Sequence, residues 1–248
     1  MHKIHDLQKM FIRPPIHDGM KYANTLSEWS HNDSERNFKA NMAVKSKQKL
    51  IQAQGWDQPN AITYDINSQG FRCNELQENR NAIVFLGCSH TYGVGLPIQN
   101  TYVYNLSTML DMPYFNLGIP GSALDTAFRM ACYWLHIIKP KIVVCFHGIY
   151  RMEHRISSDD MNVFLCTDGR ELSKSWFCCD ENSEYNGLKN FLAIESICKD
   201  ISADFYAWRT EHEFNQMGPT DQARDIMHFG PRAHEKLSEK MYQEIVNE

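Results

Sequence analysis

The chain has 248 residues, enough for one complete α/β domain plus an extension but too few for two full domains. Its 25 Lys and Arg residues against 30 Asp and Glu residues give a net charge of -5, and no basic run forms a footprint for nucleic acid or lipid headgroups. No apolar run approaches the roughly 20 residues of a membrane span, and the N-terminus lacks the apolar core of a signal peptide, so we expect a cytoplasmic protein without a membrane partner.

Residues 1–80 have a different residue pattern from the rest of the chain, and we expect them to form an N-terminal extension. A charged segment around residues 32–50 predicts a helix. Within residues 62–72 an apolar alternation stops at the turn sequence 67–70 and resumes with Phe71, which predicts a small hairpin closed by a glycine-containing turn. We expect this extension to pack on the main domain.

Short apolar segments alternate with longer amphipathic ones across residues 81–248, which is typical of an α/β domain whose parallel sheet has helices on both faces. Strands are predicted at 82–87, 113–118, 141–146 and 204–209, in a sheet of about five strands. Helices are predicted at 101–110, 122–138, 187–200 and after Pro231. Residues 151–186 are polar and too long for a plain connection, so we expect an insertion over the strand ends.

The eight cysteines are scattered through the chain, and several lie inside apolar segments, as reduced structural thiols do. No Cys-x-x-Cys pair is present, and the adjacent Cys178 and Cys179 cannot easily bind one zinc ion together. The expected site therefore contains no metal and no cofactor.

The first candidate site is the sequence GCSHTYGVG at residues 87–95, directly after a predicted strand. A serine at such a strand end is presented at the carboxyl edge of the sheet, where Ser89 could act as a nucleophile. The spacing is neither the Gly-x-Ser-x-Gly elbow nor a phosphate-binding loop. Ser89 could also simply cap the following turn. We expect His90, its neighbour, to have a structural or rim role.

The second candidate site is the segment 225–231, DIMHFGP, just before the last predicted helix. The spacing between Asp225 and His228 lets the carboxylate reach one imidazole nitrogen while the other nitrogen faces outward. Such a segment supplies both a general base and the group that orients it. The alternative is that Asp225 caps a turn and His228 has no chemical task.

Three segments together resemble the SGNH (GDSL-like) hydrolase family. GCSHTYG resembles the first block of that family, with Ser89 as nucleophile, and DIMH resembles the last, with Asp225 and His228. FNLGIPGSA, which contains Asn116, resembles the second block, so Gly121 would join Ser89 in donating backbone N–H groups to an oxyanion hole. The resemblance covers residues 80 to 245 approximately, and NSQGFR resembles a feature ahead of such domains in bacterial and phage proteins.

The resemblance implies a three-layer, flavodoxin-like α/β/α fold and metal-independent hydrolysis or transfer of acyl esters. Two departures stand out. The third block of the family supplies an asparagine to the oxyanion hole, but here Ile149 is at that place, and Cys88 replaces the usual aspartate before the nucleophile. The candidates for a replacement donor or for a contact with substrate are His147, Tyr150 and Arg151, and further contacts are expected from His90 and Asn116.

The leading hypothesis is a serine esterase acting on a small-molecule or glycan acyl ester, with an O-acetyl group as one candidate. An acyltransferase would use the same triad. The rival hypothesis is a binding module, in which an incomplete oxyanion hole reflects lost activity and the pocket recognises a glycan or a protein partner. A metal-assisted phosphoesterase using Asp225, His228 and His147 is the weakest alternative. The sequence leaves the oligomeric state open, and a phage origin would make association with a virion an option.

Overall fold

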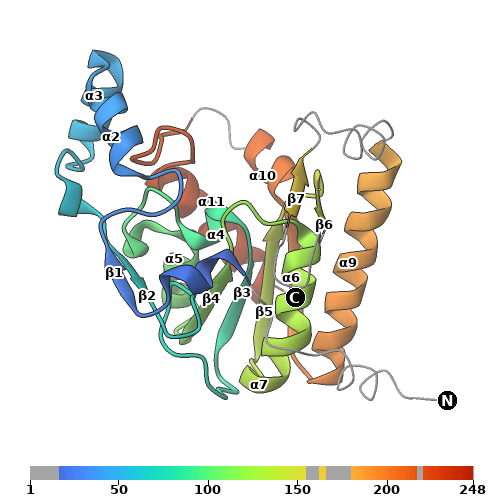
Figure 1. Ribbon diagram of the computed structural model, residues 1–248. Helices are drawn as coiled ribbons and strands as arrows, with labels where there is room; N and C mark the ends of the chain where they lie inside the picture. The colour runs from blue at the N-terminus through green and yellow to red at the C-terminus, as the bar shows by residue number, and fades with distance from the viewer. Residues whose placement is uncertain (1–16, 155–161, 166–179, 217–219, 248) are drawn as a thin grey trace.

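The structure, a computed structural model, describes residues 17–154, 162–165, 180–216 and 220–247 (Figure 1). In this part of the chain the central sheet has four strands, all parallel, in the order β4-β3-β5-β8. They are β3 (Ile83–Gly87), β4 (Tyr114–Gly118), β5 (Ile142–His147) and β8 (Asp204–Arg209). The predicted α/β fold with a parallel sheet is confirmed, with four described strands where about five were expected.

Helices cover both faces of this sheet and form its outer layers. Because side chains alternate along a strand, Ile83 and Phe85 of β3 pack on one face with α5 (Tyr102–Met109) and α11 (Pro231–Val246). Val84 and Leu86 face the other layer. That layer consists of α6 (Leu124–Met130), the π-helical turn η4 (Ala131–Leu135), α7 (His136–Ile138) and α9 (Asp180–Asp200).

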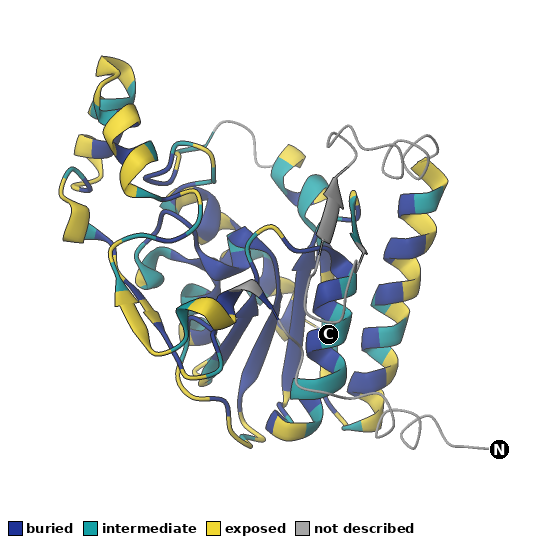
Figure 2. Ribbon diagram, in the orientation of Figure 1, coloured by how far each residue is buried: buried dark blue, intermediate teal, exposed yellow. Residues whose placement is uncertain are grey.

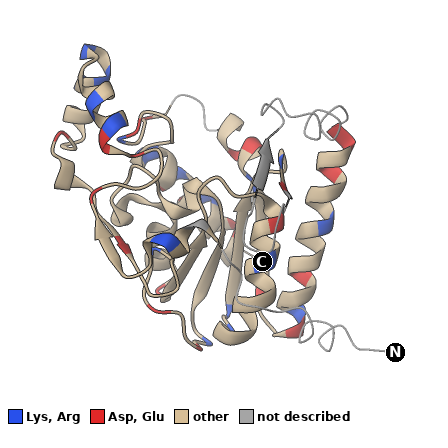
Figure 3. Ribbon diagram, viewed as in Figure 1, with Lys and Arg blue, Asp and Glu red and all other residues tan. Residues whose placement is uncertain are grey.

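β3, β4 and β5 are deeply buried, as Figure 2 shows. β3, β4 and β5 contain no Lys, Arg, Asp or Glu, and the charged residues in Figure 3 lie mainly on helices and loops. Strands that are buried on both faces of a sheet favour such predominantly apolar sequences. None of the described helices is both long and apolar enough to cross a membrane.

The predicted insertion at 151–186 lies only partly within the described residues. It contains two antiparallel strands, β6 (Arg151–His154) and β7 (Asn162–Leu165). Its last residues already belong to α9, which begins at Asp180 and so starts earlier than predicted. The remaining residues, 155–161 and 166–179, lie outside the described part.

The N-terminal extension differs from its prediction in two ways. The single predicted helix is two helices, α2 (Glu35–Met42) and α3 (Lys45–Ala53), and the predicted hairpin is wrong. β2 (Tyr64–Ile66) pairs antiparallel with β1 (Thr25–Ser27) instead of with the residues after the turn.

The turn itself explains why no hairpin forms. The Asn67 side chain accepts hydrogen bonds from the backbone N–H groups of Gln69 and Phe71, while Gly70 adopts a positive φ of 84°. The Phe71 side chain is then fully buried in the core of the main domain. The chain therefore turns into the core and does not return along β2.

An apolar cluster joins the extension to the main domain. Trp56, Ile62 and Tyr64 of the extension pack with Leu96 and Ala223, and Phe38, Ile51, Ile66, Tyr92 and Val94 complete the cluster. Three short 3-10 helices, η1 (Asp18–Tyr22), η2 (Pro59–Ala61) and η3 (Ile98–Asn100), connect these elements.

A buried ion pair crosses the same boundary. Arg224 and Asp33 are 0% and 1% exposed, and the Arg224 Nη2 to Asp33 Oδ2 distance is 2.7 Å. Arg224 also donates to the carbonyl oxygens of Glu28 and Pro59, and Tyr64 donates its hydroxyl to Asp33. The guanidinium lies 4.7 Å from the ring centre of Trp29. Both charges are thus enclosed and satisfied by hydrogen bonds, as a buried ion pair requires.

We predict that Asp33→Ala destabilises the protein by about 3–5 kcal/mol, because it leaves the Arg224 charge buried without its counterion. Adding Arg224→Met should recover much of that loss. Urea unfolding followed by tryptophan fluorescence measures both effects. Glu35→Ala is the control, since the Glu35–Lys39 pair is exposed and should contribute at most about 0.5 kcal/mol. A loss below about 1 kcal/mol for Asp33→Ala would contradict the assigned role of the pair.

Candidate active site

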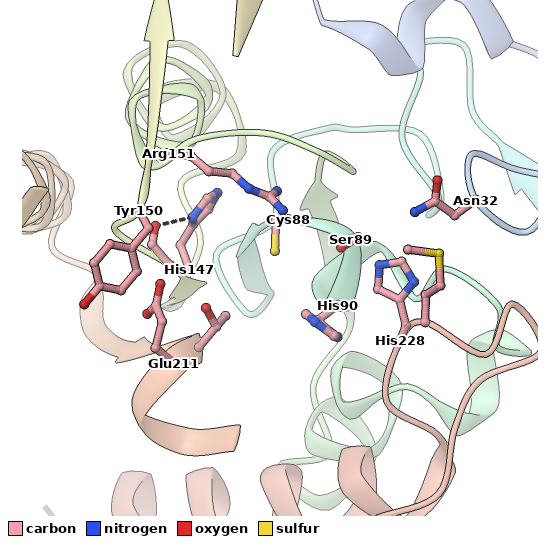
Figure 4. A pocket seen from close by; sticks show the side chains of 12 residues that line it. Asn32, Cys88, Ser89, His90, His147, Tyr150, Arg151, Glu211 and His228 are labelled. Atoms are coloured by element: carbon pink, nitrogen blue, oxygen red, sulfur yellow. Dashed lines mark hydrogen bonds between the residues drawn. The ribbon is translucent and has the colours of Figure 1, made fainter. Parts of the chain in front are cut away.

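A cavity of about 420 Å³ opens at the carboxyl ends of the central strands. The chain leaves β3 toward α5 and leaves β5 toward α9, and these helices lie on opposite faces of the sheet. In open α/β sheets ligands bind at such a switch point. The cavity (Figure 4) is lined by Asn32, Cys88, Ser89, His90, His147, Gly148, Tyr150, Arg151, Thr210, Glu211, Met227 and His228.

Ser89 begins the short helix α4 (Ser89–Tyr92), immediately beyond β3. The tight connection requires glycine at position 87, because a Cβ atom there would overlap the Thr91 side chain and the Phe146 carbonyl oxygen. Ser89 is 8% exposed and lines the cavity, as Cys88 does. The Ser89 hydroxyl makes no hydrogen bond with any residue that the structure describes. It is therefore free to meet a ligand.

Arg72 holds the far end of α4 in place. Its Nη1 donates to the carbonyl oxygens of Tyr92 and Gly93, and its Nη2 donates to those of Thr63 and Leu96. Burial lowers the pKa of this guanidinium, which no carboxylate contacts directly among the described residues. Four carbonyl oxygens thus replace a counterion and fix the Ser89 turn to the extension.

Asp225 and His228 form the orienting pair that their spacing predicts. Asp225 Oδ2 lies 2.6 Å from His228 Nδ1, and Asp225 Oδ1 accepts hydrogen bonds of 3.1 Å from the backbone N–H groups of Met227 and His228. Ile226 adopts a φ of 61°, an unfavourable conformation for a β-branched residue. The turn is held from outside: Asn41 Nδ2 donates to the Asp225 carbonyl, 3.1 Å away.

The second nitrogen of His228 is available for chemistry. With Nδ1 bound to Asp225, Nε2 makes no hydrogen bond to a described residue, and the imidazole is directed toward Ser89 in Figure 4. No hydrogen bond joins Ser89 to His228 here. The two side chains line one cavity, so the structure brings together all three residues predicted to form a triad.

The backbone N–H groups of Ser89 and Gly121 have no hydrogen-bond acceptor among the described residues. The loop of Gly121 is tied to the end of β3, since the Ile119 N–H donates to the Gly87 carbonyl oxygen over 2.9 Å. Gly121 has a φ of 76° but does not itself line the cavity. The two groups could act as oxyanion donors.

The end of β5 provides no side-chain amide. Ile149 is buried, and its backbone N–H donates to Glu211 Oε1 over 3.0 Å. His147 Nδ1 bonds the Gly148 carbonyl, and its Nε2 bonds Ser122 Oγ over 3.2 Å. Burial lowers the pKa of His147 to about 4. A neutral imidazole donating from Nδ1 and accepting at Nε2 fits both bonds.

His90 supports the His228 ring. Their ring centres are 5.1 Å apart in an edge-on arrangement, and the ring centre of Phe214 lies 4.5 Å from that of His90. Burial, followed by the charges of His228 and His234, lowers the pKa of His90 well below its usual value. This arrangement gives a physical reason for the expected structural or rim role of His90. Because the His90 ring stays neutral, it adds no positive charge next to His228 when His228 takes up a proton.

His234, which the sequence analysis missed, is a second neutral ring in this cluster. Its Nδ1 accepts a hydrogen bond of 3.0 Å from the Tyr102 N–H at the start of α5. Burial, with a smaller effect of His228, lowers the pKa of His234 to about 3. His234 therefore links α11 to α5 as an uncharged acceptor.

Asn116 is not at the cavity, contrary to the predicted contact with substrate. It is fully buried, and its side chain bonds the Thr91 carbonyl oxygen and the Gly118 N–H. Tyr150, Arg151, His147 and His90 do line the cavity. The lining residues that sequence reasoning missed are Asn32, Thr210, Glu211 and Met227. A polar cluster after β8, at Thr210 and Glu211, was the available signal.

No protein-family model and no curated protein matches the sequence. Among solved structures the chain is similar to the lipase/acylhydrolase from Enterococcus faecalis, with 17% identity, a TM-score of 0.38, and coverage of 67% of this chain and 95% of that one. It is also similar to a psychrotrophic esterase from Pseudoalteromonas sp., with 18% identity, a TM-score of 0.36 and coverage of 67% and 97%. A carbohydrate acetylesterase from Sinorhizobium meliloti matches with 11% identity, a TM-score of 0.37 and coverage of 68% and 99%.

We predict that acid destabilises the fold through its neutral histidines. Below pH 6.5 the unfolded chain protonates an imidazole that the folded protein keeps neutral, so stability falls between pH 6.5 and the folded pKa of about 3 for His234. Lowering the pH from 7.5 to 5.5 should cost about 1 kcal/mol per such histidine. Urea unfolding of His234→Gln, whose amide oxygen can still accept the Tyr102 N–H, should show a correspondingly smaller loss.

His212→Gln is the matched control for this experiment, because His212 is an exposed residue of α10 (Thr210–Gln216). That variant should lose the same stability as the native protein over the pH interval. An identical pH dependence for His234→Gln and the native protein would contradict the assigned neutrality of His234.

Proposed function

We propose that the protein is a serine hydrolase that cleaves acyl esters through Ser89, His228 and Asp225. The observation that carries this proposal is the His228 ring, which Asp225 holds by Nδ1 at 2.6 Å while Nε2 is left free in the cavity that also contains Ser89. An imidazole oriented in this way can accept the proton of a serine hydroxyl. The resemblance of the three sequence blocks to SGNH hydrolases supports the same roles.

The reaction proceeds in two steps. Ser89 Oγ attacks the acyl carbon as His228 Nε2 takes its proton, and the carbonyl electrons move to the oxygen. The backbone N–H groups of Ser89 and Gly121 stabilise this oxyanion. Its collapse expels the alcohol, which receives the proton from His228, and leaves an acyl group on Ser89. Water, deprotonated by His228, then releases the acid and restores the serine. Asp225 stabilises the protonated imidazole in both steps.

The cavity favours a small, polar ester. Its volume of about 420 Å³ lies at the small end of the range for ligand sites. Asn32, Thr210 and Glu211 offer hydrogen-bond partners for hydroxyl groups, and Tyr150, 37% exposed, offers an aromatic face. We therefore propose small O-acyl esters, including O-acetyl groups of sugars, as the substrate class.

We predict that a fluorophosphonate probe labels the native protein at Ser89, since such probes react with serines activated by a neighbouring base. Ser89→Ala should abolish the labelling, and His228→Ala should slow it strongly. Cys88→Ala is the matched variant, because Cys88 lines the same cavity as the adjacent alternative nucleophile and should not be the labelled residue. Gel fluorescence and peptide mapping measure both rate and position.

Unlabelled native protein that is fully folded by circular dichroism would overturn the proposed hydrolase activity. Labelling that survives in Ser89→Ala and disappears in Cys88→Ala would move the nucleophile to the thiol.

We predict that Asp225→Asn lowers kcat for 4-nitrophenyl acetate by about four orders of magnitude, because the amide no longer holds His228 in the tautomer that accepts a proton at Nε2. Steady-state kinetics provides the measurement. Asp221→Asn, in the same loop but hydrogen-bonded to the backbone N–H of Arg232, is the control. Loss of less than about tenfold in Asp225→Asn would remove Asp225 from the mechanism.

A further inference from the structure

The candidate oxyanion hole has a defined gap at the end of β5. The backbone N–H groups of Ser89 and Gly121, which have no acceptor among the described residues, are its candidate donors. On the third side, the Ile149 side chain is buried and its N–H is already bound to Glu211, so residue 149 supplies no donor to the cavity. A donor on this side must come from another residue.

Arg151 lies on that side of the cavity. It follows β5 by a short connection and begins β6, and it lines the cavity together with Cys88 and Ser89. Its Nη1 donates to the Ser122 carbonyl oxygen over 3.3 Å, which ties the guanidinium to the loop that carries Gly121. In Figure 4 the guanidinium is directed from β6 toward Cys88 and Ser89.

The effect of Arg151 on the pKa values of neighbouring residues agrees with this position. The positive charge of Arg151 contributes to lowering the pKa of His90, which follows Ser89, and of His147, at the end of β5. The guanidinium is thus close to both strand ends that border the cavity.

The positive charge of the Arg151 guanidinium is not neutralised by any residue that the structure describes. Among those residues no carboxylate forms an ion pair with it. Glu153 binds Arg129 and Thr126, and Asp125 binds Asn186 and Asn190. Glu211, which lines the same cavity, accepts the Ile149 N–H through Oε1, while its buried Oε2 has no hydrogen-bond partner among the described residues. A guanidinium has five N–H donors, and only one contact is made here. The remaining donors can reach a ligand.

We infer that Arg151 is the third oxyanion donor of this site and takes the place of the side-chain amide that position 149 lacks. This inference rests on the proposed hydrolase function and adds a residue to it. The guanidinium would donate N–H bonds to the carbonyl oxygen as it becomes negative, and its permanent charge would strengthen those bonds. Arg151 is then a catalytic residue.

The test compares Arg151→Met, Arg151→Lys and native protein on a neutral ester, 4-nitrophenyl acetate, and on an anionic one, mono(4-nitrophenyl) succinate. Removing one oxyanion donor typically lowers kcat by about 100- to 1000-fold. We expect that loss for Arg151→Met on both esters, with KM changed by less than about threefold. Arg151→Lys keeps the charge without the planar fork and should lose less.

The control is Arg80→Met, which removes one positive charge from an exposed residue that pairs with Glu78. It should match the native protein on both esters. Thermal unfolding of each variant reports the contribution of the Arg151–Ser122 bond to folding. If Arg151→Met is unstable, Arg151→Lys decides: a kcat reduced on the neutral ester, with native stability and KM, supports the inference.

Two results would overturn the inference while leaving the hydrolase intact. One is a native kcat for Arg151→Met on the neutral ester together with a raised KM on the succinate ester, which would make Arg151 a recognition site for a substrate anion. The other is native kinetics on both esters. Failure of the hydrolase itself is distinct, because the native protein would then be inactive and unlabelled by a fluorophosphonate.

Discussion

The buried ion pair between Asp33 and Arg224 is the constraint on which the site depends most. Arg224 directly precedes Asp225, so the contacts that fix its guanidinium also fix the start of the turn that carries His228. The turn contains the strained backbone of Ile226 and cannot rely on local preference alone. Its geometry is maintained because Asp33 and the carbonyl oxygens around Arg224 satisfy a charge that has no access to water.

The N-terminal extension therefore helps to position the residues of the candidate active site. Arg72 fixes the helix of Ser89, Asp33 fixes the turn of His228 through Arg224, and Asn41 bonds the Asp225 carbonyl oxygen. Asn32, next to Asp33, reaches the cavity itself. One segment holds two parts of the main domain that are far apart in sequence, which is a direct way to set the distance between a nucleophile and its base.

Sequence reasoning succeeded where the signal is local. The apolar runs of β3 and β5 and the Asp-to-His spacing at 225–228 each depend on residues within a few positions of one another. It failed where partners are distant, since Asp33 and Arg224 are separated by 191 positions and look like ordinary surface charges. The hairpin at residues 62–72 failed because side-chain bonds from Asn67 and burial of Phe71 outweigh the strand pattern.

In the proposed mechanism Ser89, His228 and the surrounding donors converge on one acyl carbon. A crystal structure of the protein after reaction with a phosphonate ester would show whether they do. We expect phosphorus bonded to Ser89 Oγ, His228 Nε2 within hydrogen-bond distance of that oxygen or of the leaving-group position, and the phosphonyl oxygen facing the N–H groups of Ser89 and Gly121. Phosphorus bonded to Cys88, or His228 turned away from the adduct, would contradict it.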